Sequence, residues 1–158
     1  MEVAKLFANI RDIKGEILTL ERHEEYLRLS MLPGAVRYDD DKVQSSYQDP
    51  MGAFAEKVSE DEELIRKRLD TLKELNITAE RILDKMPTPK YRNLLFLRYI
   101  EGGVRYRYSW SEVAINLGYD EQYTRWDLHH AALDEAQTAY DELKTQQQPT
   151  SKSDIVYP

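Results

Sequence analysis

The 158-residue sequence contains no cysteine, so it can form neither a disulfide bond nor a thiolate metal site. It also has no uninterrupted apolar stretch of membrane-spanning length, and its first residues lack the basic run and apolar block of a secretion signal. From these absences we expect a cytoplasmic protein with no membrane partner.

The motifs of several enzyme classes are missing as well. There is no Gly-rich phosphate loop, no zinc-binding His-Glu-x-x-His and no nucleophile elbow. Of the three histidines, His23 falls on the polar side of an expected helix, where we expect it to be solvated, and His129 and His130 diverge by about 100° on another helix. The carboxylates of residues 39–41 lack the alternating spacing of a calcium loop. We therefore expect no enzymatic activity, no metal and no cofactor.

Charge is abundant but unevenly distributed. Charged residues make up 32% of the chain, the net charge is −7 and the pI is about 5.1. An acidic protein is repelled by phosphate unless its basic groups are gathered in one place. Six basic residues are gathered against the single acid Glu101, whereas residues 1–84 hold most of the carboxylates; the six are Lys85, Lys90, Arg92, Arg98, Arg105 and Arg107.

Two long segments have heptad spacing, and the composition is typical of an all-α protein. In residues 2–32 the apolar series is Val3, Leu6, Ile10, Ile13, Ile17, Leu20 and Leu27. From about residue 51 to 86 it is Met51, Ala55, Val58, Ile65, Leu69, Leu72, Ala79, Leu83 and Met86, and Glu24, Glu62 and Asn76 interrupt the two series. The pattern predicts an antiparallel, coiled-coil-like helical hairpin over residues 1–86, with a linker at 33–50, that mediates homo-oligomerisation or contacts with a partner.

Pro87 and Pro89 end the second helix and begin the next, so we place a domain boundary there. We expect residues 87–145 to form a helix-turn-helix domain that folds without the hairpin. Residues 146–158 are poor in apolar side chains and are predicted to form a flexible tail.

A helix, a turn and a second helix are predicted over residues 109–136. Ser109 or Ser111 can cap the first helix, and Gly118 follows at the position of a left-handed terminal residue. Asp120 can cap the second helix, whose apolar face contains Leu128, Ala132 and Ala136. This is the pattern of a DNA-reading helix-turn-helix, and the alternative is a plain helical hairpin.

The candidate reading residues lie off that apolar face, on the early turns of the second helix. They are Gln122, Tyr123, Arg125, Trp126 and His129. By bidentate geometry, Arg125 suits guanine and Gln122 suits adenine. Trp126 either stacks on a sugar or fills the core of the domain.

The segment before the first of these helices supplies further candidates. Arg105 and Arg107 alternate with tyrosines and predict a clamp on the DNA backbone or minor groove, the alternative being a solvated loop. Ser109, where this segment meets the helix, completes the candidate DNA-binding set.

The segment Leu97-Arg98-Tyr99-Ile100-Glu101-Gly102, followed by residues 110–119 and Ala132-Leu133, resembles the fourth region of bacterial sigma factors, which reads the −35 promoter element. The two long helices, with Tyr38-Asp39 and Val43-Gln44-Ser45-Ser46 between them, resemble the late-gene transcriptional regulators of phages and prophages of the RinA and ArpU type. This resemblance covers about residues 2–140 and implies a DNA-binding activator of phage late genes. Residues 104–108 lengthen one connection relative to the sigma pattern, and the reading helix is poorer in Lys and Arg.

The sequence leaves two other functions open. One is a phage DNA-packaging protein like the small terminase subunit, which also pairs a helix-turn-helix with coiled-coil helices but assembles as a ring. The other is a module that mimics a sigma domain and binds RNA polymerase without DNA. For the leading hypothesis the partners are double-stranded promoter DNA and, through the hairpin, RNA polymerase or a second copy of the chain.

Overall fold

The computed structural model describes residues 2–31 and 50–148 of the chain. All the elements in these ranges are helices, as the composition predicted, and none of these helices is long and apolar enough to cross a membrane. The predicted linker, with its three aspartates and its Tyr-Asp and Val-Gln-Ser-Ser segments, and most of the predicted tail lie outside the described residues.

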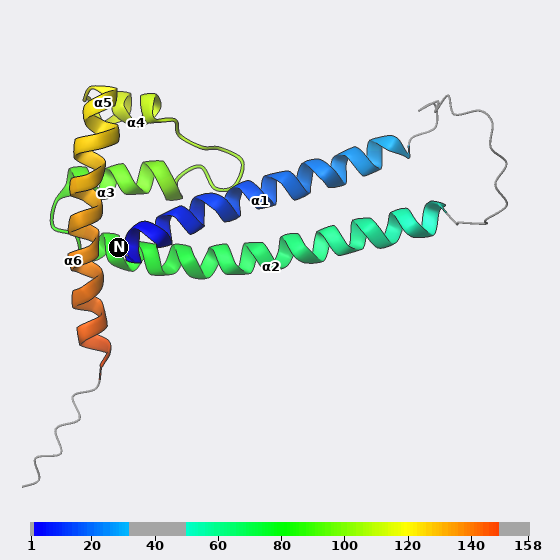
Figure 1. Ribbon diagram of the computed structural model, residues 1–158, viewed down its shortest axis with the longest axis horizontal. Helices are drawn as coiled ribbons and strands as arrows, with labels where there is room; N and C mark the ends of the chain where they lie inside the picture. Colours follow the sequence, from blue (N-terminus) through cyan, green and yellow to red (C-terminus); the bar gives the residue numbers. More distant parts are fainter. Residues whose placement is uncertain (1, 32–49, 149–158) are drawn as a thin grey trace, which may run out of the picture.

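The two longest helices form an elongated rod. Helix α1 spans Glu2–Ser30 and α2 spans Pro50–Lys85, close to the ranges expected from the heptads. The helices lie side by side and run in opposite directions over most of their length (Figure 1). We call this pair the rod.

The rod buries some of the residues in the predicted heptad series fully and others only partly. On α1, Val3, Ile10 and Ile17 are buried as expected, Phe7 and Lys14 are buried beside them, and Leu6 and Ile13 are partly buried against the same core. The side chain of a lysine was not expected there, because lysine is ordinarily a surface residue.

On α2 the predicted seam is confirmed at four residues that are all buried, Leu72, Ala79, Leu83 and Met86. Leu69, which the pattern had included, is 42% exposed. Asp61 is 5% exposed, so a polar residue occupies a seam position that the sequence assigned to its neighbour Glu62.

Polar pairs also join α1 to α2 along the rod. His23 was expected to be solvated, but its Nδ1 lies 2.5 Å from Oδ2 of the buried Asp61. A buried carboxylate needs such a partner, because burying it alone would cost several kcal/mol. A second pair between the helices joins Arg68 Nε to Glu16 Oε2 at 2.8 Å, with both side chains about half exposed.

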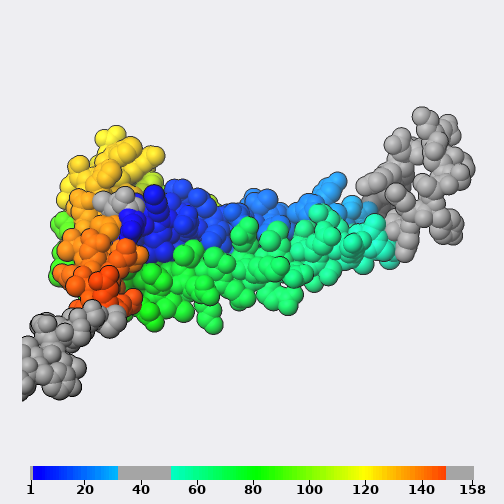
Figure 2. Space-filling view, turned by 60° about the horizontal axis from the view of Figure 1, so that its bottom comes forward, coloured from blue at the N-terminus to red at the C-terminus, as the bar shows by residue number. Residues whose placement is uncertain are grey.

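The remaining helices form a head at one end of the rod, which we define as residues 89–148. Helix α3 (Pro89–Leu95) continues into one wide π-helical turn, η1 (Phe96–Ile100). After a loop come α4 (Trp110–Leu117), α5 (Glu121–Tyr123), a second π-helical turn η2 (Thr124–Leu128) and α6 (His129–Gln147). Helix α6 crosses the end of the rod, and Figure 2 shows the head as a thick mass at that end.

One hydrophobic core joins the rod to the head. Its buried members come from all the long helices and include Phe7, Ile10, Ala79, Ile82, Met86, Leu94, Leu95, Tyr99, Leu128 and Ala132. Phe7 of α1 packs against Tyr99 of η1 with ring centroids 5.0 Å apart. The core therefore continues across the boundary that the two prolines mark in the sequence.

Helix α6 also holds the beginnings of two other helices. The Val3 amide of α1 donates to Oε1 of Gln137 at 3.0 Å. The amide and hydroxyl of Thr88, the residue before α3, donate to the two carboxylate oxygens of Glu135 at 2.8 and 2.7 Å. Free amides at helix starts are thus satisfied by side chains of α6, which fixes the rod and α3 relative to it.

Candidate nucleic-acid interface

The turn between α4 and α5 is built as the sequence predicted. Of the two candidate caps, Ser109 is the one used: its Oγ accepts from the Glu112 amide at 3.2 Å, and the Glu112 carboxylate accepts from the Ser109 amide at 3.0 Å. This reciprocal capping box stabilises the start of α4. Gly118 ends the helix with φ of 78°, a left-handed conformation that favours glycine.

The second helix begins two residues later. The Asp120 carboxylate accepts from the amides of Gln122 and Tyr123 at 3.1 and 3.3 Å, so the predicted cap is confirmed. The Thr124 hydroxyl donates to the Asp120 carbonyl at 2.8 Å and is fully buried. Together with buried Leu128 on the same face, these contacts hold the first turns of the helix against the core.

The opposite face of these first turns is open to solvent. Gln122, Tyr123, Arg125 and Trp126 are all exposed. Trp126 is 56% exposed, which excludes the alternative that it fills the core. The Arg125 guanidinium lies over its ring, 5.3 Å from the centroid. The structure therefore brings four of the predicted reading residues together on one surface.

Part of this surface belongs to a wide helical turn that includes Arg125 and Trp126. Residues Thr124–Leu128 form a π-helical turn between the α-helical segments on either side. Such single turns often occur at functional sites, because they change the direction in which side chains leave the helix. No feature of the sequence predicted this π-helical turn.

His129 belongs to the interior of the head rather than to this surface. Its Nε2 lies 2.8 Å from the Tyr99 hydroxyl, and its ring meets Trp110 edge-on with centroids 4.8 Å apart. Burial, with smaller contributions from the charges of His130 and Arg98, lowers the pKa of His129 to about 4. The ring is therefore neutral at pH 7 and serves as a packing and hydrogen-bonding group.

The loop between η1 and α4 runs back along the rod. Arg107 Nη2 donates to the Arg11 carbonyl of α1 at 3.2 Å. A methyl group built on Gly15 would lie 2.6 Å from the same nitrogen, so the glycine makes room for the guanidinium. Arg107, one of the two predicted clamp residues, thus packs against the backbone of α1. The Tyr106 hydroxyl of the same loop donates to the Glu112 carboxylate of α4 at 3.0 Å.

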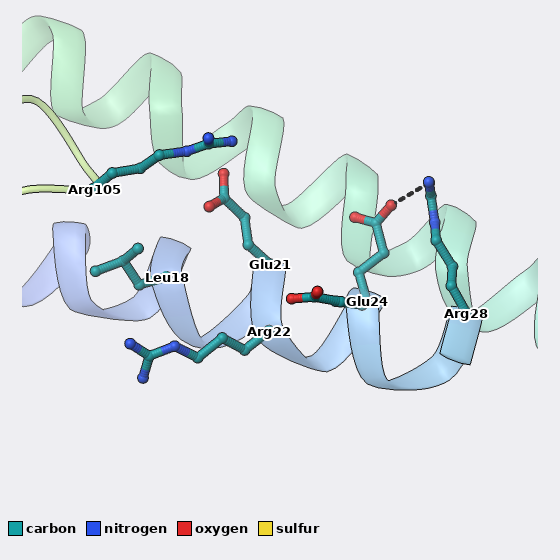
Figure 3. Close-up of a pocket in the computed structure, with 7 residues that line it drawn as sticks. Leu18, Glu21, Arg22, Glu24, Arg28 and Arg105 are labelled. Atoms are coloured by element: carbon teal, nitrogen blue, oxygen red, sulfur yellow. Dashed lines mark hydrogen bonds and ion pairs between the residues drawn. The ribbon is translucent and has the colours of Figure 1, made fainter. Parts of the chain in front are cut away.

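Arg105 extends from this loop over the acidic side of α1. Figure 3 shows it above α1, with Glu21 pointing toward it and Glu24 paired to Arg28. These residues line an open pocket of about 490 Å³ together with Leu18, Arg22 and Glu25. In this arrangement the charge of Arg105 is partly offset by the neighbouring carboxylates.

The basic residues that cluster in the sequence separate in the structure. Arg92 lines a pocket with Glu80 and Asp84 of α2, so its surroundings are acidic. Arg98 takes another direction: Nη1 donates to the Tyr108 carbonyl at 2.5 Å and the guanidinium stacks 4.5 Å from the Trp110 ring centroid.

Two basic residues of α1 join Arg98 and Arg107, and sequence reasoning missed both. Arg11 and Lys14 line a small cavity with these two arginines. Lys14 is only 3% exposed, and its ammonium group donates to the Tyr99 and Ile100 carbonyls at 2.5 and 3.2 Å. Its place between Ile10 and Ile17, one helical turn from each, was the signal that this lysine faces inward.

The candidate interface thus has two parts, an exposed helix face with Arg125 at its centre and a basic junction between the loop and the rod. Both are placed by elements that share the core, so their relative position is fixed. The sequence matches no family model, and comparisons with curated proteins and with solved structures give no significant match.

Proposed function

We propose that this protein is a sequence-specific, double-stranded DNA-binding transcriptional activator of phage or prophage late genes. The observation that carries the proposal is the exposed face of α5 and η2. It presents a bidentate donor, an amide and two aromatic rings from the first turns of a helix whose other face is buried. Those first turns are the part of a reading helix that enters the major groove.

The finer architecture belongs to the same proposal. The rod is a coiled-coil-like hairpin, and the head is a domain like the fourth region of sigma factors, in which α4 supports the second helix. The capping box at Ser109, the left-handed Gly118 and the cap at Asp120 support it, because they make the short helix, tight turn and long helix that such a domain needs. The late-gene role rests on the resemblance of the sequence to phage regulators.

Each exposed side chain has a chemical role in this proposal. Arg125 pairs with the O6 and N7 of guanine, and Gln122 pairs with the N6 and N7 of adenine. Tyr123 and Trp126 contact sugars or thymine methyl groups beside them. Because Glu121 and Asp127 flank the same turns and repel phosphate, the helix binds with its axis in one orientation only.

The test is to compare Arg125→Ala with a charge-matched control, Arg66→Ala on the exposed side of α2. Duplexes are first selected by the protein from a random pool, and affinities are then measured on the selected and scrambled sequences. Losing one bidentate contact weakens binding to the selected duplex by about 1–3 kcal/mol, or roughly 5- to 150-fold, with a smaller effect on the scrambled one. Arg66→Ala leaves the discrimination unchanged. Equal losses on both duplexes mean that this helix does not read bases.

One alternative has an observation in its favour. Ile115 of α4 is 76% exposed and Tyr119 of the turn is 41% exposed, next to Tyr123. Such an apolar surface suits a protein partner, and a sigma-mimicking module would dock on RNA polymerase with it. If random pools yield no selected duplex and the protein instead binds polymerase, with binding lost in Ile115→Asp, this function replaces the first. A ring-sized mass in solution would favour the packaging protein.

A further inference from the structure

We propose that Arg11 and Lys14 of α1, with Arg98 and Arg107, form a binding site for phosphate groups of the DNA backbone. The inference rests on the proposed function and deepens it. It assigns part of the DNA contact to the rod, which the sequence had reserved for assembly and partner contacts.

The four cations come from three different segments and meet at one place. Arg11 and Lys14 lie one turn apart on α1, Arg98 comes from η1, and Arg107 comes from the loop that crosses α1. The Arg107 guanidinium lies against the backbone of α1 at the Arg11 carbonyl, and Lys14 reaches the carbonyls that end η1. The site therefore exists only when rod and head are folded together.

The cluster carries more positive than negative charge. The carboxylates near it are Glu101, which lines the same cavity, and Asp12, which binds Arg11 at 3.1 Å. Among the described residues, no carboxylate lies within ion-pair distance of Lys14, Arg98 or Arg107. Clustered cations whose donors are satisfied mainly by carbonyl groups leave their charge available to an external anion.

Burial, and to a smaller extent the neighbouring cations, lowers the pKa of two of the groups. Burial first, and then the charge of Arg107, lowers the pKa of Lys14 to about 8. Burial also lowers the pKa of Arg98; the charge of Tyr99 opposes this, and Arg11, Arg107 and Arg125 make smaller contributions that lower it further. An anion at this site would relieve this repulsion.

The size of the cavity decides how an anion can bind. Its volume is about 40 Å³, close to the ~30 Å³ share of one water molecule in the liquid. A phosphate group cannot enter it, but one oxygen can approach its mouth while the remaining atoms stay in solvent. This geometry fits a phosphate that is part of a continuous backbone, in which each contact uses only one or two oxygens.

The experiment measures how the affinity of the full chain for a labelled, scrambled 20-base-pair duplex depends on salt. Wild type, Arg11→Gln and Arg107→Gln are compared with Arg66→Gln, a control with the same loss of net charge. Arg11 is suited to replacement because its side chain is half exposed, and urea unfolding verifies that each variant is folded. The scrambled sequence isolates phosphate contacts from base reading.

We expect Arg11→Gln and Arg107→Gln each to lower the slope of log affinity against log salt by about 1. Between 50 and 200 mM salt, each variant then loses roughly three- to fourfold less affinity than wild type. If wild type binds and both variants have its slope, this inference is overturned and the proposed function remains. An equal shift in Arg66→Gln also overturns it, because net charge would then explain the effect. If wild type binds neither scrambled nor selected duplexes, both proposals are wrong.

Discussion

Gly15→Ala is the substitution that tests most directly how the loop lies on the rod. Alanine is favoured over glycine inside an exposed helix by about 0.8–1.0 kcal/mol, so the change would by itself stabilise α1. In the folded protein, however, the new methyl group would lie 2.6 Å from Arg107 Nη2. The guanidinium is the far end of a flexible side chain, so it can move aside, and in doing so it loses its bond to the Arg11 carbonyl.

The two effects oppose each other and can be separated. A hydrogen bond of this kind contributes about 0.5–1.5 kcal/mol, which cancels most of the gain in helix propensity. Gly15→Ala should therefore change the free energy of unfolding by less than about 0.7 kcal/mol in wild type. In an Arg107→Ala background, where nothing obstructs the methyl group, it should stabilise the protein by about 0.8–1.0 kcal/mol.

A double-mutant cycle from urea unfolding gives the difference, which we expect to be about 0.5–1 kcal/mol. Ala8→Gly, on the same helix, calibrates the value of glycine against alanine in α1. Equal stabilisation by Gly15→Ala in both backgrounds would show that Arg107 does not lie over Gly15. Destabilisation in the Arg107→Ala background would show that the backbone needs glycine for another reason.

Two further predictions concern the head. The pKa of His129, about 4 in the folded protein, lies below its unfolded value of 6.5, so unfolded chains bind more protons between these pH values. The free energy of unfolding should fall by roughly 1–3 kcal/mol from pH 6.5 to 4, and His129→Gln should remove this part of the pH dependence in urea titrations. Separately, residues 87–148 should give the circular dichroism of an unfolded chain, because Phe7, Ile10 and Ile82 complete the core; a helical, cooperative fragment would contradict this.

Local signals in the sequence were sufficient to predict the structure wherever a residue contacts others only a few positions away in the chain. The box formed by Ser109 and Glu112, the left-handed Gly118 and the cap at Asp120 depend on spacings of two to four residues. Such spacings are fixed by helix geometry, and the sequence displays them directly. The helix boundaries follow from the same signals.

The signals failed where a polar residue is satisfied by a distant partner. Lys14 and Asp61 were left out of the predicted heptad series, but carbonyls of η1 pair with Lys14 and the ring of His23 pairs with Asp61, across 38 residues or more. Leu69 was included in the predicted seam because it is apolar and has heptad spacing, but its side chain is 42% exposed. Nor does any local pattern indicate that Phe7 of α1 packs in the same core as Tyr99, Leu128 and Ala132 of the head.

The shared core at the base of the rod has a geometric consequence for anything that meets its far end. With about 1.5 Å of rise per residue, the 29 residues of α1 span about 43 Å, and the packing of α6 across the base leaves no hinge between this lever and the head. If the head binds DNA as proposed, the position of the head along the duplex determines the direction, around the DNA axis, in which the far end of the rod points. A shift of half a helical turn, about 5 base pairs, turns that end to the opposite side, and a full turn of about 10.5 restores it. Contact with a partner bound at the far end of the rod would therefore vary periodically with the number of base pairs between the DNA site of this protein and the DNA site of the partner.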